Sequence, residues 1–239
     1  MKIVLIGYGK MGKAIEEIVS ADENLDIVLI IDKDNVNELT KENLQKADVA
    51  IEFTTPKTAV QNIHTCVDAG IPVVVGTTGW YDNLEAVTEY VLANNGSIVH
   101  ATNFSIGVNI FFEINKILAE IMRDQPQYDV AIEETHHTQK LDAPSGTAIT
   151  LAERILSKLK TKNSWVNNKT SIKEELEIIS HRIENVPGTH EVIYSSEADE
   201  IKLIHTARSR KGFAEGAILA AKWIKDKKGI FTMKDVLGI

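Results

Sequence analysis

Short apolar runs alternate with helical patterns over the first hundred residues. Strands are predicted where four or five apolar residues follow one another, and helices where apolar residues recur on one face. Near-continuous apolar strands that alternate with helices are typical of a parallel sheet covered on both faces. The predicted strands are residues 2–6, 27–31, 49–53, 72–75 and 97–101, and the predicted helices are residues 13–19, 58–69 and 82–94.

The pattern changes after residue 105. Predicted elements then follow in the order helix (108–122), strand (128–134), helix (147–158), polar surface loop (160–171) and three strands (176–181, 190–195 and 201–207). Consecutive strands with short links indicate an antiparallel meander. The last predicted helix, residues 213–225, is apolar on one face, and we expect it to pack on the first domain.

The fold class is therefore α/β, with two domains. We predict an N-terminal Rossmann dinucleotide-binding domain over residues 1–104, completed by residues 213–239. The second domain, residues 105–212, is predicted to be α+β with a mostly antiparallel sheet. It is expected to bind the substrate.

Composition narrows the functional classes. The chain has 239 residues with 26 basic and 34 acidic side chains, a net charge of −8. An acidic chain without a basic cluster argues against nucleic acid or an anionic membrane as a partner. No apolar run reaches the roughly 20 residues that span a bilayer, and the apolar start is short enough to be a strand. The one cysteine, Cys66, cannot form an intrachain disulfide. A reducing compartment fits, so we expect a cytoplasmic protein.

A glycine-rich loop, Gly7-Tyr8-Gly9-Lys10-Met11-Gly12, follows the first predicted strand and opens a helix. This context predicts a dinucleotide site, because the glycines let backbone approach the pyrophosphate and the helix N-terminus attracts it. Asp32 lies 20 residues past the last glycine and can accept hydrogen bonds from a ribose 2′-hydroxyl. Its charge should favour NADH over NADPH, a preference that the neighbouring Lys33 can soften.

Two further loops follow predicted strands at the carboxyl edge of the sheet, where α/β sheets bind ligands. Their small and hydroxyl-bearing residues allow a nicotinamide ring to approach backbone, although tight-turn chemistry alone also explains such residues. The two loops are Gly76-Thr77-Thr78 and Ala101-Thr102-Asn103-Phe104.

Candidate catalytic groups gather between residues 133 and 147. His136, His137 and Lys140 follow a predicted strand, and Ser145-Gly146-Thr147 starts a predicted helix whose N–H groups can bind a carboxylate. Lysine adds a positive charge, and histidine can supply a proton near neutral pH. The segment predicts reduction of an anionic, imine-like or unsaturated substrate. A solvated or buried structural role for the two histidines is the alternative. The remaining histidines are interpreted as structural, with a modest exception for His190. They lack metal-ligand spacing, so no metal site is expected.

The segment from Glu134 to Ala148, Glu-Thr-His-His-Thr-Gln-Lys-Leu-Asp-Ala-Pro-Ser-Gly-Thr-Ala, closely resembles the signature of the dihydrodipicolinate reductase family. This family is also called 4-hydroxy-tetrahydrodipicolinate reductase and belongs to diaminopimelate and lysine biosynthesis. The resemblance runs over nearly the whole chain. It includes the segments 53–56, 75–79, 103–109 and 209–217.

The resemblance implies a cyclic dicarboxylate substrate, 4-hydroxy-tetrahydrodipicolinate, which is reduced with loss of water. It implies that His136 exchanges a proton with the substrate and that Lys140 is a second proton donor. It places His137, Gly146 and Thr147 at the substrate carboxylates, and the glycine loop, Asp32 and the two further loops at NADH or NADPH. Members are usually homotetramers joined through the sheet of the second domain.

Two other functions compete with this one. A related NAD(P)-dependent imine or amino-acid dehydrogenase shares the Rossmann loop, but the His-His-x-x-Lys and Pro-Ser-Gly-Thr combination argues against it. A non-enzymatic, redox-sensing Rossmann module needs no proton donor. Such a module commonly carries a nucleic-acid or partner-binding segment, and the sequence contains no basic patch of that kind.

Overall fold

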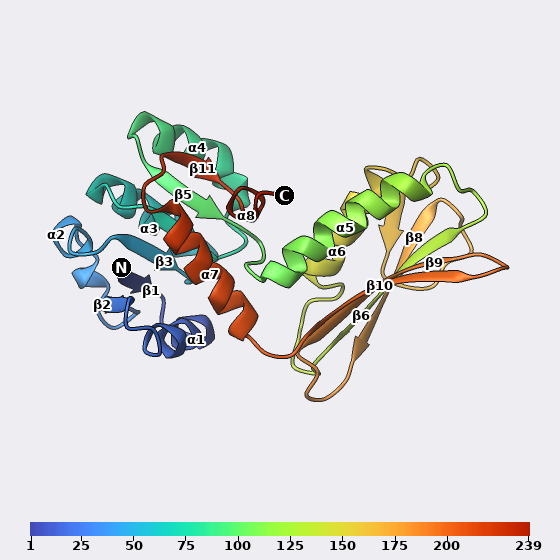
Figure 1. Ribbon diagram of the computed structural model, residues 1–239, viewed down its shortest axis with the longest axis horizontal. Coiled ribbons are helices and arrows are strands. Elements are labelled where there is room, and N and C mark those ends of the chain that lie inside the picture. Colours follow the sequence, from blue (N-terminus) through green and yellow to red (C-terminus); the bar gives the residue numbers. More distant parts are fainter. The chain divides into compact units, whose positions relative to one another are not determined.

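The computed structural model describes residues 1–239, and the chain divides into two compact units (Figure 1). Unit 1 comprises Met1–Ile106 and Arg210–Ile239, and unit 2 comprises Gly107–Ser209. Each unit has its own sheet and its own hydrophobic core. None of the helices combines the length and the apolar character that crossing a membrane requires.

Unit 1 contains a six-stranded parallel sheet in the order β11-β5-β4-β3-β1-β2. Its strands are β1 (Lys2–Ile6), β2 (Asp26–Ile31), β3 (Val49–Glu52), β4 (Val73–Val75), β5 (Ser97–His100) and β11 (Gly229–Phe231). The Rossmann-type parallel sheet predicted from the apolar runs is confirmed. The sixth strand, β11, was not predicted, because it has only two apolar residues, Ile230 and Phe231, which follow a charged stretch and a glycine.

Helices cover both faces of this sheet. One face carries α1 (Lys10–Val19), α7 (Lys211–Ile224) and α8 (Met233–Leu237), and the other carries α2 (Lys41–Leu44), α3 (Pro56–Ala69) and α4 (Leu84–Ala93). Alternate residues of β1 point to opposite faces, so Ile3 and Leu5 enter one core and Val4 and Ile6 the other. Two 3₁₀ turns, Val36–Glu38 and Tyr81–Asn83, precede α2 and α4.

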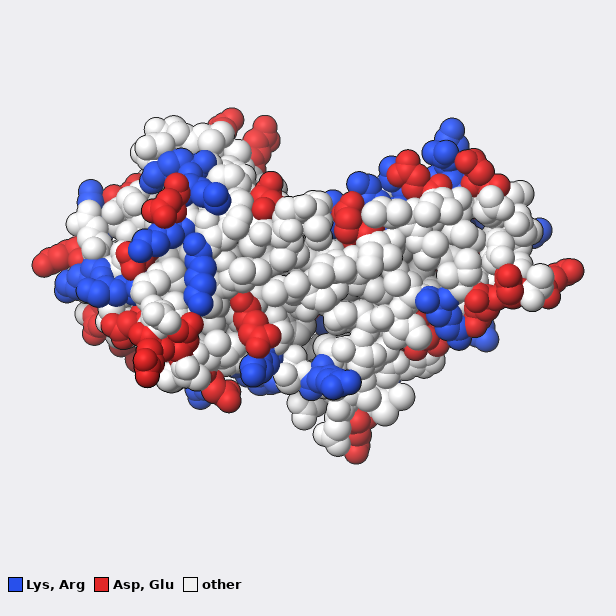
Figure 2. Space-filling model, viewed as in Figure 1, with Lys and Arg blue, Asp and Glu red and all other residues white.

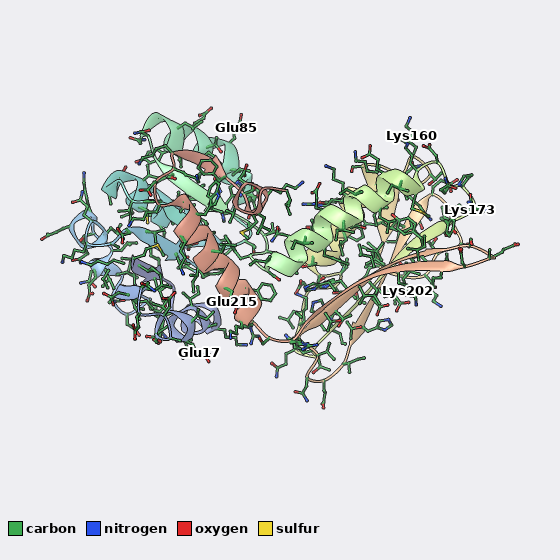
Figure 3. All side chains as sticks on the ribbon, viewed as in Figure 1. Glu17, Glu85, Lys160, Lys173, Lys202 and Glu215 are labelled. Carbon is green, nitrogen blue, oxygen red and sulfur yellow. The ribbon has the colours of Figure 1, made fainter.

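Unit 2 contains a five-stranded mixed sheet in the order β10-β9-β6-β8-β7. Its strands are β6 (Asp129–His136), β7 (Ser164–Val166), β8 (Glu175–Arg182), β9 (Gly188–Ser195) and β10 (Glu200–Ala207). The helices α5 (Ile106–Met122) and α6 (Gly146–Leu156) supply residues to the core on one face of this sheet. Charged side chains such as Lys160 and Lys202, labelled in Figure 3, lie at the surface of this unit.

Two details of the predicted second domain were wrong. The strands β9 and β10 pair antiparallel, but β8 does not join them in a meander, because β6 lies between β8 and β9 and pairs parallel with β8. The apolar side chains of β6, Val130 and Ile132, are buried against the helices. This burial favours a central place in the sheet for β6, between β8 and β9, over the direct pairing of β8 with β9 that a short connection would allow. The stretch 160–171, which was predicted to be a loop, contains the edge strand β7. Trp165 of this strand stands among polar residues in the sequence, so the stretch lacks the apolar run that predicted other strands.

Candidate active site

The glycine loop forms the tight turn between β1 and α1. Gly7 has φ of +97°, and a Cβ there would lie 2.0 Å from the carbonyl oxygen of Phe53. A Cβ on Gly12 would lie 2.4 Å from the carbonyl oxygen of Gly7, whereas nothing lies within 4 Å of one on Gly9. Gly7 and Gly12 therefore make the turn possible, and Gly9 leaves its backbone open to a ligand at the start of α1.

A cavity of about 430 Å³ lies beside this loop. It brings together three parts of the carboxyl edge of the sheet, lined by Gly9, Lys10, Met11, Phe53, Thr54, Pro56, Gly76, Thr77 and Thr78. A side chain at Gly76 would collide with the ring of Phe53, since its Cβ would lie 2.0 Å from that ring. Open backbone, hydroxyl groups and a helix N-terminus in one cavity fit the phosphates of a dinucleotide.

The other predicted cofactor residues do not line this cavity. The N–H of Gly7 donates to the carbonyl of Ile31 at 2.8 Å, which sets the exposed Asp32 beside the loop. The Tyr8 hydroxyl turns back and donates to Glu16 on α1. The backbone of Tyr8 is therefore the part of this residue that can contact a cofactor.

The loop after β5 contains the remaining predicted cofactor residues. The N–H of Ala101 donates to the carbonyl of Val75 at 3.4 Å, and Thr102 is exposed. The Asn103 side chain accepts from the N–H of Ser105 at 2.9 Å. Phe104 is buried in the core of unit 1, so its ring supports the fold and its backbone alone is available.

Glu52, which the sequence did not single out, lies buried at the end of β3 under the cavity. One of its oxygens, Oε1, accepts from the N–H of Thr54 at 3.2 Å and from Nδ2 of Asn62 at 3.3 Å. Burial raises the pKa of this carboxyl, and the hydrogen bonds of Thr54, Thr77 and Asn62 oppose that effect. The carboxyl thus connects the Thr54 turn to the Thr77 turn.

The candidate catalytic groups cluster on the inner face of the sheet of unit 2. Burial alternates along β6, and Glu134 and His136 both fall on the face that packs against the helices. The register places His190 of β9 opposite Glu134 and Arg182 of β8 opposite His136. Three strands therefore converge on one buried site at the carboxyl end of β6.

Glu134 is fully buried and lies at the centre of this cluster. Its Oε2 lies 2.7 Å from Nδ1 of His136. Its Oε1 accepts from the guanidinium of Arg182 at 3.1 Å and from the N–H of Ser145 at 3.3 Å. Burial alone would raise the pKa of Glu134, but hydrogen bonds from His136, Ser180 and Ser145 outweigh it and hold the pKa far below its usual range. The carboxyl is therefore ionised.

Ser145 and His190 complete the cluster. The Ser145 hydroxyl accepts from the N–H of Ala148 and so caps α6, and it lies 3.0 Å from Nε2 of His190. The ring of His190 meets that of His136 edge to face, with centroids 5.0 Å apart. Burial, helped by the charge of His136, lowers the pKa of His190 to about 3, so this ring is neutral.

The loop after β6 carries the other predicted residues. The N–H of Lys140 donates to the carbonyl of His137 at 3.1 Å. The ammonium of Lys140 lies 2.8 Å from both carboxylate oxygens of Asp142. Gly146 opens α6 with no atom within 4 Å of its Cβ position, next to Thr147. The predicted helix N-terminus at residues 145–147 is confirmed.

Sequence reasoning missed four residues of this cluster: Glu134, Asp142, Arg182 and Gly188. Only the first carried a usable signal, because Glu134 stands two residues before His136 on a predicted strand and therefore shares its face. Arg182 and Gly188 belong to other strands, whose order the sequence did not reveal. His190 was noted only as a modest exception among histidines interpreted as structural.

Glu134, His136 and His190 also have the potential ligand atoms for a metal, since these atoms lie within 4.8 Å of one another. Their contacts, however, already resemble a hydrogen-bonded network. The carboxylate is bonded to the Arg182 guanidinium, and His190 is paired with the Ser145 hydroxyl. A second cation at this site would face the charge of Arg182.

Comparisons with known proteins give a consistent result. Residues 1–104 match the family described as dihydrodipicolinate reductase, N-terminus, and residues 107–237 match its C-terminus. A 4-hydroxy-tetrahydrodipicolinate reductase from Christiangramia forsetii is 50% identical over 238 residues, covering 100% of this chain and 98% of the relative. One from Methanocaldococcus jannaschii is 39% identical and covers 98% of this chain and 81% of the relative.

A solved structure is similar over nearly the whole chain. It is a dipicolinate-bound dihydrodipicolinate reductase from Paenisporosarcina sp. TG-14, with a TM-score of 0.80, 25% identity and 97% of each chain covered. A meso-diaminopimelate dehydrogenase variant from Clostridium tetani shares the fold, with a TM-score of 0.59 and 14% identity. The competing dehydrogenase therefore shares the architecture, while the whole-chain sequence similarity lies with the reductases.

Proposed function

The chain belongs to the dihydrodipicolinate reductase family, and we propose that it reduces 4-hydroxy-tetrahydrodipicolinate to tetrahydrodipicolinate with NADH or NADPH. The substrate loses its hydroxyl group together with one of its own hydrogens as water, and one hydride and one proton are added in their place. The reaction belongs to diaminopimelate and lysine biosynthesis. The observation that carries the proposal is the buried Glu134–His136 pair beside the N-terminus of α6, within the family signature.

Unit 1 fits NAD(P)H as its cofactor. When bound, the nicotinamide supplies the hydride. The open backbone at Gly9 and the N-terminus of α1 suit the pyrophosphate, and Asp32 suits the ribose. The threonines at 77 and 78 and the backbone of the Ala101–Phe104 loop suit the nicotinamide end.

In unit 2, His136 is proposed to exchange the proton with the substrate. Its Nδ1 faces the Glu134 carboxylate, which leaves Nε2 as the nitrogen that can reach a substrate atom. Lys140 is proposed as a second proton donor. Its ammonium, held by Asp142, also adds the positive charge that a dicarboxylate needs.

The carboxylates of the substrate are proposed to bind at His137 and at the first turn of α6. The N–H groups at the start of a helix have no partner one turn earlier in that helix, and the helix dipole favours an anion there. Gly146 leaves room for the close approach of a carboxylate, beside Thr147. Ser145 is proposed to contribute through this turn, because its hydroxyl is occupied by the Ala148 N–H and His190.

We propose a homotetramer in the cytoplasm, as is usual for the family. The face of the unit 2 sheet opposite the helices carries Ile179, Ile193 and Ile204, and Ile204 is 53% exposed. Exposed apolar side chains gathered on a sheet face are typical of a subunit interface. Charged residues of both signs are interspersed over the face of the molecule seen in Figure 2. Analytical ultracentrifugation measures the assembly directly.

Coupled turnover tests the activity. Pyruvate and aspartate semialdehyde are converted by the preceding synthase, and the wild-type chain is added with NADH or NADPH. We expect cofactor oxidation that depends on the synthase, and a product that mass spectrometry finds lighter than the substrate by one oxygen atom. Cofactor oxidation without that product would contradict the proposed reaction.

A further inference from the structure

Glu134 is a fully buried carboxylate held by groups from β6, β8 and the start of α6. Its Oε1 accepts from Arg182 and from the Ser145 N–H, and its Oε2 lies 2.7 Å from Nδ1 of His136. A carboxylate removed from water is strongly unfavourable unless it is paired and hydrogen-bonded. Oε2 is the oxygen that faces His136.

Arg182 is itself fixed. One of its nitrogens, Nη1, donates to the carbonyl of His181 at 2.8 Å, and Nη2 donates to the carbonyl of Asp142 at 2.7 Å as well as to Glu134. A planar guanidinium anchored at three oxygens restricts the orientation of the carboxylate it binds. Arg182 therefore fixes Glu134, and Glu134 in turn fixes the His136 ring.

Three charged groups lie around the pair formed by His136 and the neutral His190. They are Glu134 on β6, Arg182 on β8 and Lys140 on the loop after β6, whose charge acts on His190. Among these groups, Glu134 is the only anion in direct contact with the His136 ring. An anion 2.7 Å from Nδ1 favours the neutral ring with hydrogen on Nδ1, which leaves Nε2 unprotonated.

We propose that Glu134, anchored by Arg182 and the Ser145 N–H, is the positioning residue of this active site: it orients His136 and keeps Nε2 as the nitrogen that exchanges the proton with the substrate. The role rests on the proposed function. Glu134 does not touch the substrate and acts through the His136 ring.

The chain supplies a matched control on the same strand. Glu133 faces the opposite side of the sheet, where its Oε2 lies 3.3 Å from Nε2 of His181. This acid–histidine pair is about half exposed, with side-chain exposures of 46% and 44%. Glu133→Gln therefore removes a carboxylate from a histidine without touching the buried cluster. Because Glu133 lies beside Ile179 on the sheet face proposed for subunit contacts, analytical ultracentrifugation checks that this variant assembles like the wild type.

The experiment compares Glu134→Gln, Glu134→Asp and Glu133→Gln with the wild type in the coupled reaction. We expect Glu134→Gln to lower kcat by about 10²–10⁴-fold, the range for general acid–base groups, with the substrate KM and the NADH dissociation constant within about threefold. The pH profile of kcat should also change. Its decline at alkaline pH should begin at a lower pH in Glu134→Gln than in the wild type, because the variant lacks the anion that stabilises the His136 imidazolium. Glu134→Asp should recover part of kcat, and Glu133→Gln should match the wild type.

A glutamine variant with wild-type kcat and pH profile overturns the proposal, provided that the wild type turns over the substrate. An inactive wild type refutes the proposed function instead. If Glu134→Gln does not fold, nitrogen-15 NMR of wild-type His136 decides: a neutral ring with hydrogen on Nδ1 supports the role, and hydrogen on Nε2 overturns it. Loss of wild-type activity on chelation, restored by zinc, would assign the cluster to a metal and also overturn it.

Discussion

The backbone of Gly188 lies directly against the ring of His136. A Cβ added at Gly188 would lie 3.0 Å from Nε2 and 3.1 Å from Cδ2 of His136. Gly188 is the first residue of β9, so the missing side chain leaves space beside the nitrogen that we propose to reach the substrate.

The first prediction concerns this space. Gly188→Ala should lower kcat by about tenfold or more, because a ring held by Glu134 cannot retreat without losing proton-transfer geometry. The NADH dissociation constant should stay unchanged, since the glycine loop belongs to unit 1. Steady-state kinetics and fluorescence titration measure the two quantities. Gly212→Ala is the control, because its new methyl group would approach only the Ser105 hydroxyl, at 3.9 Å; equal kinetics of both variants would refute the steric argument.

The second prediction concerns Lys140. Lys140→Ala should lower kcat and raise the substrate KM by about tenfold to a hundredfold, the value of hydrogen bonds to charged groups. The change removes both a proton donor and the charge that attracts a dicarboxylate. Initial rates over a range of substrate concentrations separate the two effects. Lys173→Ala, which removes an exposed lysine elsewhere in unit 2 (Figure 3), is the control. Normal kinetics in Lys140→Ala would remove Lys140 from the mechanism.

The third prediction concerns cofactor choice. Asp32→Ala should raise kcat/KM for NADPH relative to NADH by about tenfold, because it removes the acceptor for the 2′-hydroxyl and the charge that repels a 2′-phosphate. Kinetics with both cofactors give the ratio. Asp34→Ala, an exposed acid two residues further on, should leave it unchanged. If the ratio is the same in wild type and Asp32→Ala, Asp32 does not contact the ribose.

The fourth prediction concerns the buried Glu52. Because burial raises its pKa in the folded chain, ionisation of Glu52 disfavours folding as pH rises above the unfolded value of about 4.3. Glu52→Gln should therefore increase the free energy of unfolding at pH 8. The difference from wild type should vanish below about pH 4, where both chains are neutral at this position.

Urea unfolding at the two pH values measures this difference, and Glu17→Gln on exposed α1 surface is the control. Destabilisation of Glu52→Gln at pH 8 would mean that the ionised carboxylate, through Thr54 and Thr77, supports the fold.

Several parts of the molecule could be predicted from local sequence. The apolar runs indicated five strands of unit 1, and the Asp-Ala-Pro-Ser-Gly-Thr segment indicated the start of α6, because each signal lies within a few residues. Pairing between distant strands leaves no such signal. Nothing near residue 134 indicates that β8 and β9 flank β6, so the contacts of Arg182, Gly188 and His190 with the site emerged only from the fold.

The kinetics of His136→Gln test the central claim most directly. Wild type and variant are compared for NADH and NADPH oxidation in the presence of the synthase product, and their NADH dissociation constants are measured in parallel. The account predicts rapid oxidation by the wild type, a kcat about 10²–10⁴-fold lower in His136→Gln, and the same NADH dissociation constant. A variant that turns over like the wild type, or that loses NADH binding while keeping its residual turnover, would contradict it.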